Sequence, residues 1–345
     1  MRNLTTIFGL LILAAGCVGE IGEQPDDKPF DGTDPNDPRL EARVWRLTPA
    51  QYNTEVQRFF PGAPVVNLPV GSSEYGITNI SAAARIDLGN ASQFNDAARS
   101  IGTWVAAQGA PAARCQTFDA ACVDTFLGWF PAAAYRRPPT DQEIAELRGV
   151  YDDTVVTYGH EWAFSALVRT VLLSPQFLYR HEIGPDGAGV VEIDDYEVAS
   201  LLAFSLTDQG PDDELLGDAS AGLLRDPAVR EEHARRLMDR TGPIWQRFFW
   251  EWLKMSTLAS QGNETGLPPE LVADLEAEYR AFVSGIVIDG RGGLTDLLTT
   301  NHTWATPAVA TYYGATHPGG GVAKFDLDPN QRGGLLTLGS WLVAH

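Results

Sequence analysis

The amino-acid sequence predicts an all-α protein, an irregular multi-helix architecture with long loops and few or no strands. Two observations carry this prediction: capping patterns precede helical runs of apolar residues, and alternating β-branched runs are scarce. Residues 64–70, bounded by prolines, and residues 189–193 are the segments with the character of strands. We therefore expect fewer than about one residue in ten in strands.

Capping patterns mark where the helices begin. Thr48 with Gln51 forms a capping box with proline at the first helical position, and it predicts a helix over residues 48–60. Thr140 with Glu143 forms a second box ahead of apolar residues at helical spacing. Apolar periodicity predicts further helices over residues 162–173, 194–206, 226–239, 241–255 and from 268 toward 288, the first of them buried.

The segment 1–17 predicts where the protein is sent. A basic start at Arg2, an apolar run over residues 4–15 and the sequence Ala-Ala-Gly-Cys17 form an export signal, and its end resembles the lipobox of bacterial lipoproteins. The apolar run is too short to cross a bilayer, which takes about 20 residues. We expect lipidation of Cys17 and a lipid anchor in the cell envelope, at the outer membrane. An ordinary secretory signal with an incidental cysteine is the alternative.

Residues 18–43 form an acidic tether rich in proline and glycine. Between residues 18 and 40, seven acids stand against Lys28 and Arg39. The whole chain of 345 residues carries a formal net charge of −20, which argues against a nucleic-acid partner. Its 44% hydrophobic content predicts folded domains. We divide the rest of the chain into the segments 44–112, 113–185, 186–330 and 331–345.

Cys115 and Cys122 are the cysteines that follow Cys17. In an exported protein such a close pair predicts a disulfide rather than a metal site. The bridge would close a small loop and contribute about 2–3 kcal/mol in the chain-entropy model. Two reduced, buried thiols are the alternative.

Several common catalytic and cofactor motifs are missing from the chain. The sequence has no Cys-x-x-Cys-His for c-type haem attachment, and no nucleophile elbow, zincin, P-loop or dinucleotide-binding pattern. We therefore expect no cofactor in this chain.

The densest acidic segment holds Asp208, Asp212, Asp213 and Glu214. Carboxylate oxygens are the ligands that Ca²⁺ prefers, so these four residues are the candidates for a metal site. Pro211 followed by acids is also how a helix begins, because proline suits the first turn and acids suit the positive end of the helix dipole. We expect helix capping to be the role of this segment, and no metal site.

Arg136, Arg137, His181 and Glu182 form the candidate functional region. Two guanidiniums can clamp an anion, and a His–Glu pair can supply metal ligands or an acid and a base. Because Arg137 precedes a proline, its backbone should be extended and the two guanidiniums should point in different directions. We expect structural roles, with one arginine paired to an acid such as Glu182 or Asp213. Convergence on an open pocket would instead indicate an anion or metal site.

Six segments, taken together and in order, resemble one family; they are residues 46–53, 134–138, 173–182, 211–216, 310–314 and 331–337. They are similar to exported proteins of planctomycetes and myxobacteria that are built from tandem domains of unknown function. The resemblance implies an all-α exported protein with no established reaction. Many of these relatives are fused to, or encoded with, c-type cytochrome modules. The resemblance also implies that the block from residue 331 is shorter in this chain than in its relatives.

We therefore interpret the chain as a cell-envelope lipoprotein, an accessory or scaffold module beside periplasmic c-type cytochromes or other envelope proteins. The membrane is a partner through the N-terminal lipid. The first alternative is an envelope enzyme, a hydrolase or a metal-dependent oxidoreductase, that uses the candidate functional region. The second is a module that binds carbohydrate or another surface ligand through Trp245, Trp250 and Trp252.

Overall fold

Helices dominate the structure, which confirms the predicted all-α class. The computed structural model describes residues 42–70, 86–87, 89–184 and 192–345, and these contain fourteen α-helices and four strands of four residues each. Cys17, and the acidic tether up to residue 41, lie outside the described residues. Among the described helices, none combines the length and the apolar character needed to cross a bilayer.

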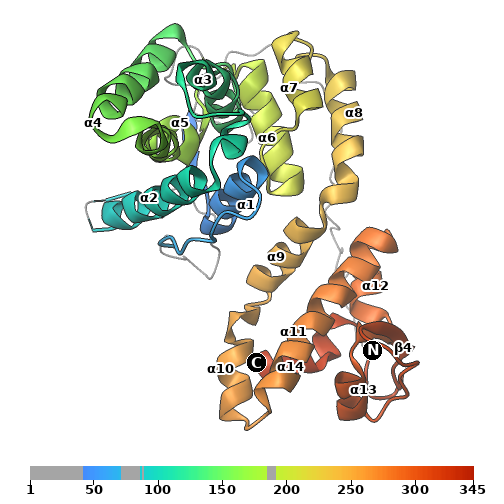
Figure 1. Ribbon diagram of the computed structural model, residues 1–345. Helices are drawn as coiled ribbons and strands as arrows, with labels where there is room; N and C mark the ends of the chain where they lie inside the picture. The colour runs from blue at the N-terminus through green and yellow to red at the C-terminus, as the bar shows by residue number, and fades with distance from the viewer. Residues whose placement is uncertain (1–41, 71–85, 88, 185–191) are drawn as a thin grey trace, which may run out of the picture. The chain divides into compact units, whose positions relative to one another are not determined.

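The largest hydrophobic core gathers buried residues between Leu47 and Phe204. Residues of the predicted segments 44–112 and 113–185 therefore share one core. Figure 1 shows α2 and α4 running beside each other within it. The elements around this core are α1 (Pro49–Phe59), α2 (Ala91–Gln108), the 3-10 helix η2 (Ala110–Ala113), α3 (Ala120–Tyr135), α4 (Asp141–Leu173) and α5 (Pro175–Leu178).

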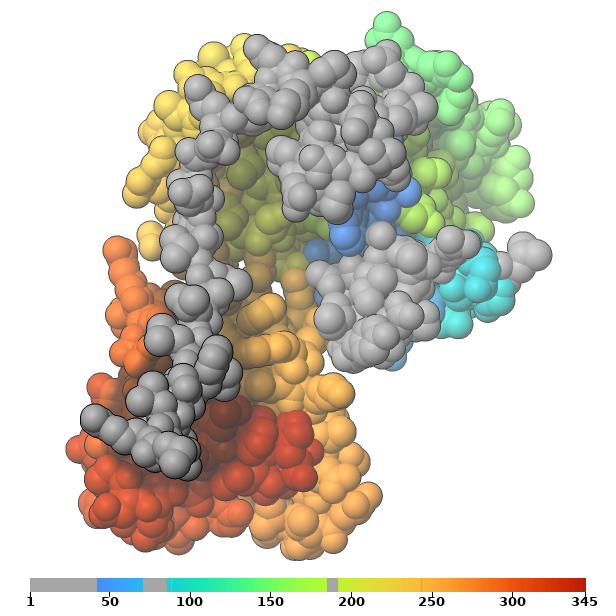
Figure 2. Space-filling model, turned by 180° about the vertical axis from the view of Figure 1, so that it is seen from behind, coloured from blue at the N-terminus to red at the C-terminus, as the bar shows by residue number. Residues whose placement is uncertain are grey.

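Both predicted capping boxes form. Thr48 Oγ1 accepts a hydrogen bond from the Gln51 backbone nitrogen, and the Gln51 side chain accepts one from the Thr48 backbone nitrogen. The box at Thr140 starts α4, in which two helical stretches meet at a kink at Gly159, where φ is 79°. The second stretch contains the predicted run 162–173. Trp162 is 61% exposed, so the buried part of that run begins one residue later. The space-filling view shows α4, coloured light green, at the protein surface (Figure 2).

Two small antiparallel sheets were not predicted. Strand β1 (Arg43–Arg46) pairs with β2 (Tyr179–Glu182), and β3 (His302–Ala305) pairs with β4 (Ala323–Asp326). Four residues are too few to reveal a period of two in the sequence. The proline-bounded residues 64–70, which have some character of a strand in the sequence, are irregular in the structure, and residues 192–193 are irregular too. Residues 189–191 of the other such segment lie outside the described residues.

Two further cores lie toward the C-terminus. A small one joins α6 (Asp195–Thr207), α7 (Asp213–Ser220) and α8 (Pro227–Leu237), and a larger one contains buried residues from Phe249 to Ala344. The helices predicted in this part of the chain are confirmed. The remaining elements are η3 (Met238–Arg240), α9 (Gly242–Trp252), η4 (Met255–Thr257), α10 (Leu258–Glu264), α11 (Pro269–Val283), the π-helix η5 (Ser284–Asp289), α12 (Leu294–Thr299), α13 (Pro307–Tyr313), η6 (Leu335–Thr337) and α14 (Gly339–Ala344).

Candidate functional site

Arg136 is a buried arginine that follows the last turn of α3, and its side chain joins α3 to the corner between α5 and β2. The residue is 3% exposed. Its Nη2 nitrogen donates hydrogen bonds to the carbonyl oxygens of Gln176, Phe177 and Tyr179 at 2.8, 3.2 and 2.8 Å. These carbonyls lie where α5 ends, so they lack the donors of a continuing helix. The Nη1 nitrogen of Arg136 is also buried, and it has no hydrogen-bond partner among the described residues.

Arg137 points elsewhere, as expected from the proline that follows it. Its Nη1 and Nη2 nitrogens donate to the two carboxylate oxygens of Glu143 at 2.9 and 2.8 Å. Glu143 also closes the capping box at Thr140, and the hydrogen bonds from Arg137 lower the pKa of its carboxyl group. The expected pairing of one arginine with an acid forms, but the acid is Glu143 rather than Glu182 or Asp213. The short turn before α4 brings Glu143 back onto Arg137, whereas Glu182 has another partner.

That partner is Arg43, and strand β2 separates Glu182 from its neighbour His181. Glu182 is 6% exposed and forms an ion pair with Arg43 across the β1–β2 pair. Successive side chains of a strand point to opposite faces, so His181 faces the other way. His181 and Glu182 therefore do not form one acid–base pair.

Three residues of the candidate functional region nevertheless meet at one cavity of about 320 Å³, near the lower end of the usual range for small-molecule sites, about 300–1,000 Å³. Ser200 contributes to its wall; it is 6% exposed, and its Oγ has no hydrogen-bond partner among the described residues. An unpaired buried polar group costs about 1–3 kcal/mol. A ligand oxygen that reaches such a group would remove this cost. The wall includes Tyr135, Arg136, Arg137, His181, Tyr196 and Ser200.

The cavity wall combines one charged arginine with side chains that are neutral at neutral pH. Burial lowers the pKa of Arg136 to about 10, so the guanidinium stays protonated at neutral pH. Burial, together with Arg136 and Arg137, lowers the pKa of His181, which keeps its imidazole neutral. Burial also raises the pKa of Tyr135. The cavity therefore offers a buried positive charge and neutral hydrogen-bonding groups.

Asp194 and Glu197 also line the cavity, and both are engaged by backbone groups. Asp194 accepts from the Glu197 backbone nitrogen at 2.8 Å, as the cap of α6. The Glu197 carboxylate accepts from the backbone nitrogens of Ile183, Gly184 and Asp194. These contacts hold the start of α6 against the end of β2. They also place two carboxylates in the cavity wall, beside its hydrogen-bond donors.

Sequence reasoning missed the contribution of α6 to the site. The capping box formed by Asp194 and Glu197 places Tyr196 and Ser200 four positions apart, on one face of the helix. This spacing is visible in the sequence, but the sequence does not show which element this face of α6 contacts. The contact between α6 and β2 is what places Tyr196 and Ser200 near His181.

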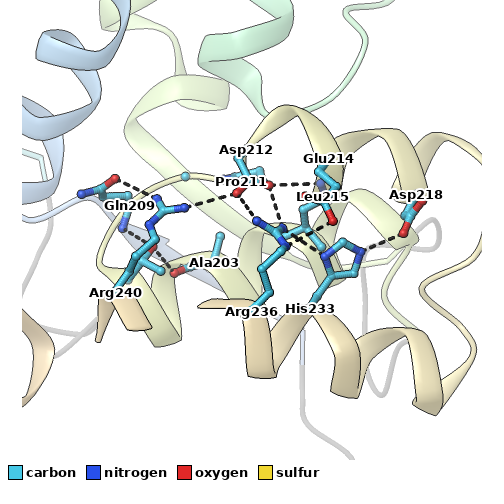
Figure 3. A network of polar contacts seen from close by, with 12 residues as sticks. Ala203, Gln209, Pro211, Asp212, Glu214, Leu215, Asp218, His233, Arg236 and Arg240 are labelled. Carbon is cyan, nitrogen blue, oxygen red and sulfur yellow. Dashed lines mark hydrogen bonds and ion pairs between the residues drawn. The ribbon is translucent and has the colours of Figure 1, made fainter. Parts of the chain in front are cut away.

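The acidic segment is bound by arginines. Figure 3 shows Asp212 between Arg236 and Arg240, whose Nη1 nitrogens donate to Asp212 Oδ2 at 2.7 and 3.2 Å. Asp212 also accepts from the Leu215 backbone nitrogen as the cap of α7, which confirms the predicted capping. The hydrogen bonds from Arg236 lower the pKa of Asp212 to about 2. Pro211 precedes the cap instead of occupying the first turn, which corrects that detail.

The other acids of this segment do not converge on a metal site. Asp208 accepts from the Gln51 side chain at 2.6 Å and forms an ion pair with Arg247. Glu214 lies 3.3 Å from Arg236, and Asp213 is exposed in the first turn of α7. Across the described residues, no group of three histidine, cysteine or acidic side chains is placed to hold a metal ion.

The three tryptophans proposed for carbohydrate binding do not share one surface role. Trp250 packs on Tyr279, with ring centroids 5.3 Å apart, in the C-terminal core. Trp252 is 57% exposed and stacks on Phe248. Trp245 lines a separate cavity of about 520 Å³. Trp245 and Trp252 both pack against Phe248, whereas Trp250 packs on Tyr279 instead, so the three tryptophans do not form one platform.

Comparison with family models matches two adjacent parts of the chain. Residues 122–182 match a model described as PSD5, protein of unknown function (DUF1595). Residues 193–315 match a model described as PSD4, protein of unknown function (DUF1592). The chain thus carries tandem domains of unknown function. No curated protein and no solved structure gives a significant match.

The cavity is built jointly by these two matched parts. Arg136 and His181 come from residues 122–182, whereas Tyr196 and Ser200 come from residues 193–315. Neither part alone supplies both the buried guanidinium and the buried hydroxyl.

Proposed function

We propose that this protein is an exported lipoprotein of the bacterial cell envelope whose helical body binds a small ligand that carries a carboxylate. Anchoring through Cys17, at the outer membrane, is supported by the basic start, the apolar run and the small residues before this cysteine. Mass spectrometry of the mature N-terminus tests the anchor. Lipid on Cys17 is the expected result, and an unmodified chain that begins elsewhere would contradict it.

The observation that supports ligand binding is that Arg136 and Ser200 line one cavity, and that each has a buried polar atom without a hydrogen-bond partner among the described residues. Arg136 keeps its positive charge, and its other terminal nitrogen is occupied by carbonyl oxygens. A carboxylate would accept from both free donors, and charge-assisted hydrogen bonds of this kind are roughly twice as strong as neutral ones.

The same cavity favours binding over catalysis. An activated serine needs a base within hydrogen-bond reach, and Ser200 Oγ has no such partner among the described residues. His181 and Glu182 face opposite sides of β2, so they do not act as a dyad. We therefore place the protein with accessory binding modules rather than with hydrolases or oxidoreductases.

A periplasmic c-type cytochrome is the protein partner that the family resemblance supports. Affinity capture of the full-length protein from envelope extracts tests this, because a bound c-type cytochrome is recognised by its haem absorbance. Capture of no haem protein would contradict the partnership and would leave the ligand site to be judged separately.

Calorimetric titration of the mature protein with D-galacturonate tests the ligand site, with neutral D-galactose as the comparison. Galacturonate should bind and galactose should bind much more weakly. Ser200→Ala removes one donor and should weaken galacturonate binding about 5- to 10-fold, since a lost hydrogen bond costs about 1–1.4 kcal/mol. Ser205→Ala is the matched control, because Ser205 lies on the same helix but is exposed. Equal effects of the two substitutions, or no binding, would contradict the proposal.

A further inference from the structure

A second cavity, of about 390 Å³, lies next to the first. The two cavities share Arg137 and Tyr196 as lining residues. The wall of the second also includes Arg114, Trp129 and Asp213. These residues come from α3, α6, α7 and the turn after η2, so the two cavities adjoin at Arg137 and Tyr196.

The second cavity combines an aromatic wall with charged side chains. Arg114 lies over the Trp129 ring, with its guanidinium carbon 3.8 Å from the ring centroid. The Trp129 indole nitrogen donates to the Ala113 carbonyl oxygen at 3.3 Å, which fixes the orientation of the ring. Asp213, in the first turn of α7, also lines this cavity and is exposed.

We infer that the two cavities form one binding site for an acidic oligosaccharide. Its carboxylate lies in the first cavity, against Arg136 and Ser200, and the neighbouring sugar ring lies in the second cavity, against Trp129. This inference rests on the proposed function, because the first cavity holds the carboxylate in both.

The side chains that line the two cavities match the chemical groups of an acidic oligosaccharide. A sugar ring has an apolar face of C–H groups and a rim of hydroxyls that both donate and accept. Tyr196, and the part of the Trp129 ring that Arg114 does not cover, offer aromatic surface for the face, which is the usual use of such amphipathic rings at binding sites. Arg114 donates to hydroxyls, and Asp213 accepts from them.

Ligands in which negative charges follow one another without neutral groups between them fit less well. Asp194 and Glu197 line the first cavity, and Asp213 lines the second. A polyphosphate would bring several charges close to these acids and would be repelled. A ligand with one carboxylate per ring, separated by neutral hydroxyls, meets donors and acceptors in turn.

The test measures how affinity depends on ligand length. The mature protein is titrated with D-galacturonate, its dimer and its trimer, and with galactobiose as the neutral dimer. The galacturonate dimer should bind at least about 10-fold tighter than the monomer, because the second ring adds contacts without a second association event. Galactobiose should bind at least about 10-fold more weakly than the acidic dimer.

Two substitutions then change only the second cavity. Gly217 lines it, and a Cβ added there would meet no heavy atom within 4 Å, so Gly217→Tyr has room to place its side chain in the cavity. Trp129→Phe keeps an aromatic ring but shortens the wall. Both substitutions should remove the gain in affinity that the second sugar ring provides, and both should leave the affinity for the monomer unchanged. Gly149→Tyr is the control, because Gly149 is another helical glycine without close neighbours and lies away from both cavities.

The outcomes separate this inference from the proposed function. Monomer binding with no gain for the dimer would overturn the extended site and leave the proposed function standing. No binding of monomer, dimer or trimer would overturn both. Equal binding of galactobiose and the acidic dimer would overturn the role of the carboxylate. Gain of affinity with length that disappears in Gly217→Tyr, but not in Gly149→Tyr, is the supporting result.

Discussion

His181 and Glu182 are adjacent in the sequence, but they serve opposite faces of strand β2. His181 lines the cavity with Arg136, whereas Glu182 is paired with Arg43 of strand β1. Substitutions at these two positions should therefore affect different properties of the protein.

His181→Ala should weaken the binding of D-galacturonate with little change in the melting temperature, because the imidazole has no hydrogen-bond partner to lose among the described residues. Glu182→Gln should leave binding unchanged and lower the free energy of unfolding by up to about 1 kcal/mol, since Arg43 is partly exposed and its ion pair is screened. Titration calorimetry and thermal melting of both variants measure this. A similar loss of ligand affinity in Glu182→Gln would contradict the assignment of the two faces.

Gly102→Ala should destabilise the protein by about 1–3 kcal/mol, as overpacking of a tight contact does. An added Cβ would lie 2.5 Å from the Ser165 carbonyl oxygen, where α2 passes α4. Gly149→Ala is the matched control: it is also helical, meets nothing within 4 Å, and should gain about 0.5–1 kcal/mol in helix propensity. Urea unfolding of both variants gives the comparison. Equal stabilities would refute the close approach of the two helices.

The predicted disulfide is confirmed: Cys115 and Cys122 are bonded, with their Cα atoms 5.6 Å apart. Replacing both by alanine should lower the free energy of unfolding by about 2–3 kcal/mol, because the unfolded chain regains the freedom of the closed loop. Thermal melting with and without reductant checks this. The parent should melt at a lower temperature when reduced, and the double variant should not respond. Two thiols that react with an alkylating reagent in the unreduced protein would speak against the bridge.

The burial of Glu278 in the C-terminal core predicts that the free energy of unfolding depends on pH. The residue is fully buried; Thr303 and Tyr313 donate to its carboxylate at 2.9 and 2.5 Å. Burial nevertheless raises its pKa to about 7 from the model-compound value of 4.5. Since the folded pKa lies above the unfolded one, this group's contribution to stability is complete below pH 4.5 and is lost as pH rises through about 7.

The variant Glu278→Gln cannot titrate, so its stability relative to the parent should change with pH. Between pH 4 and pH 8 the parent should lose on the order of 2–3 kcal/mol relative to the variant. Glu276→Gln is the control, because Glu276 lies on the same helix and pairs with Arg280 at the surface. Denaturant unfolding at both pH values measures the difference. A constant difference between parent and Glu278→Gln would exclude a raised pKa.

The capping boxes at Thr48 and Thr140 were correct because every group in them lies within four residues of the others. The disulfide followed in the same way from two cysteines close in the chain. Helix starts, helical class and the bridge are thus local properties, and local sequence is enough to set them. The β1–β2 pair joins residues near 45 to residues near 180, and neither strand is long enough to show an alternating pattern in the sequence.

The sequence by itself therefore determined the all-α class, the helices that begin with a capping box or show clear apolar periodicity, the disulfide and the residue types of the candidate site, but it did not predict α2 and α3. Tertiary structure alone decided that Arg137 pairs with Glu143, that Glu182 turns toward Arg43, and that Ser200 of α6 joins Arg136 and His181 at one cavity. The physical reason is range. A cap is satisfied within one helical turn, whereas a cavity wall depends on which helix faces pack together, and that is settled by the burial of the whole core.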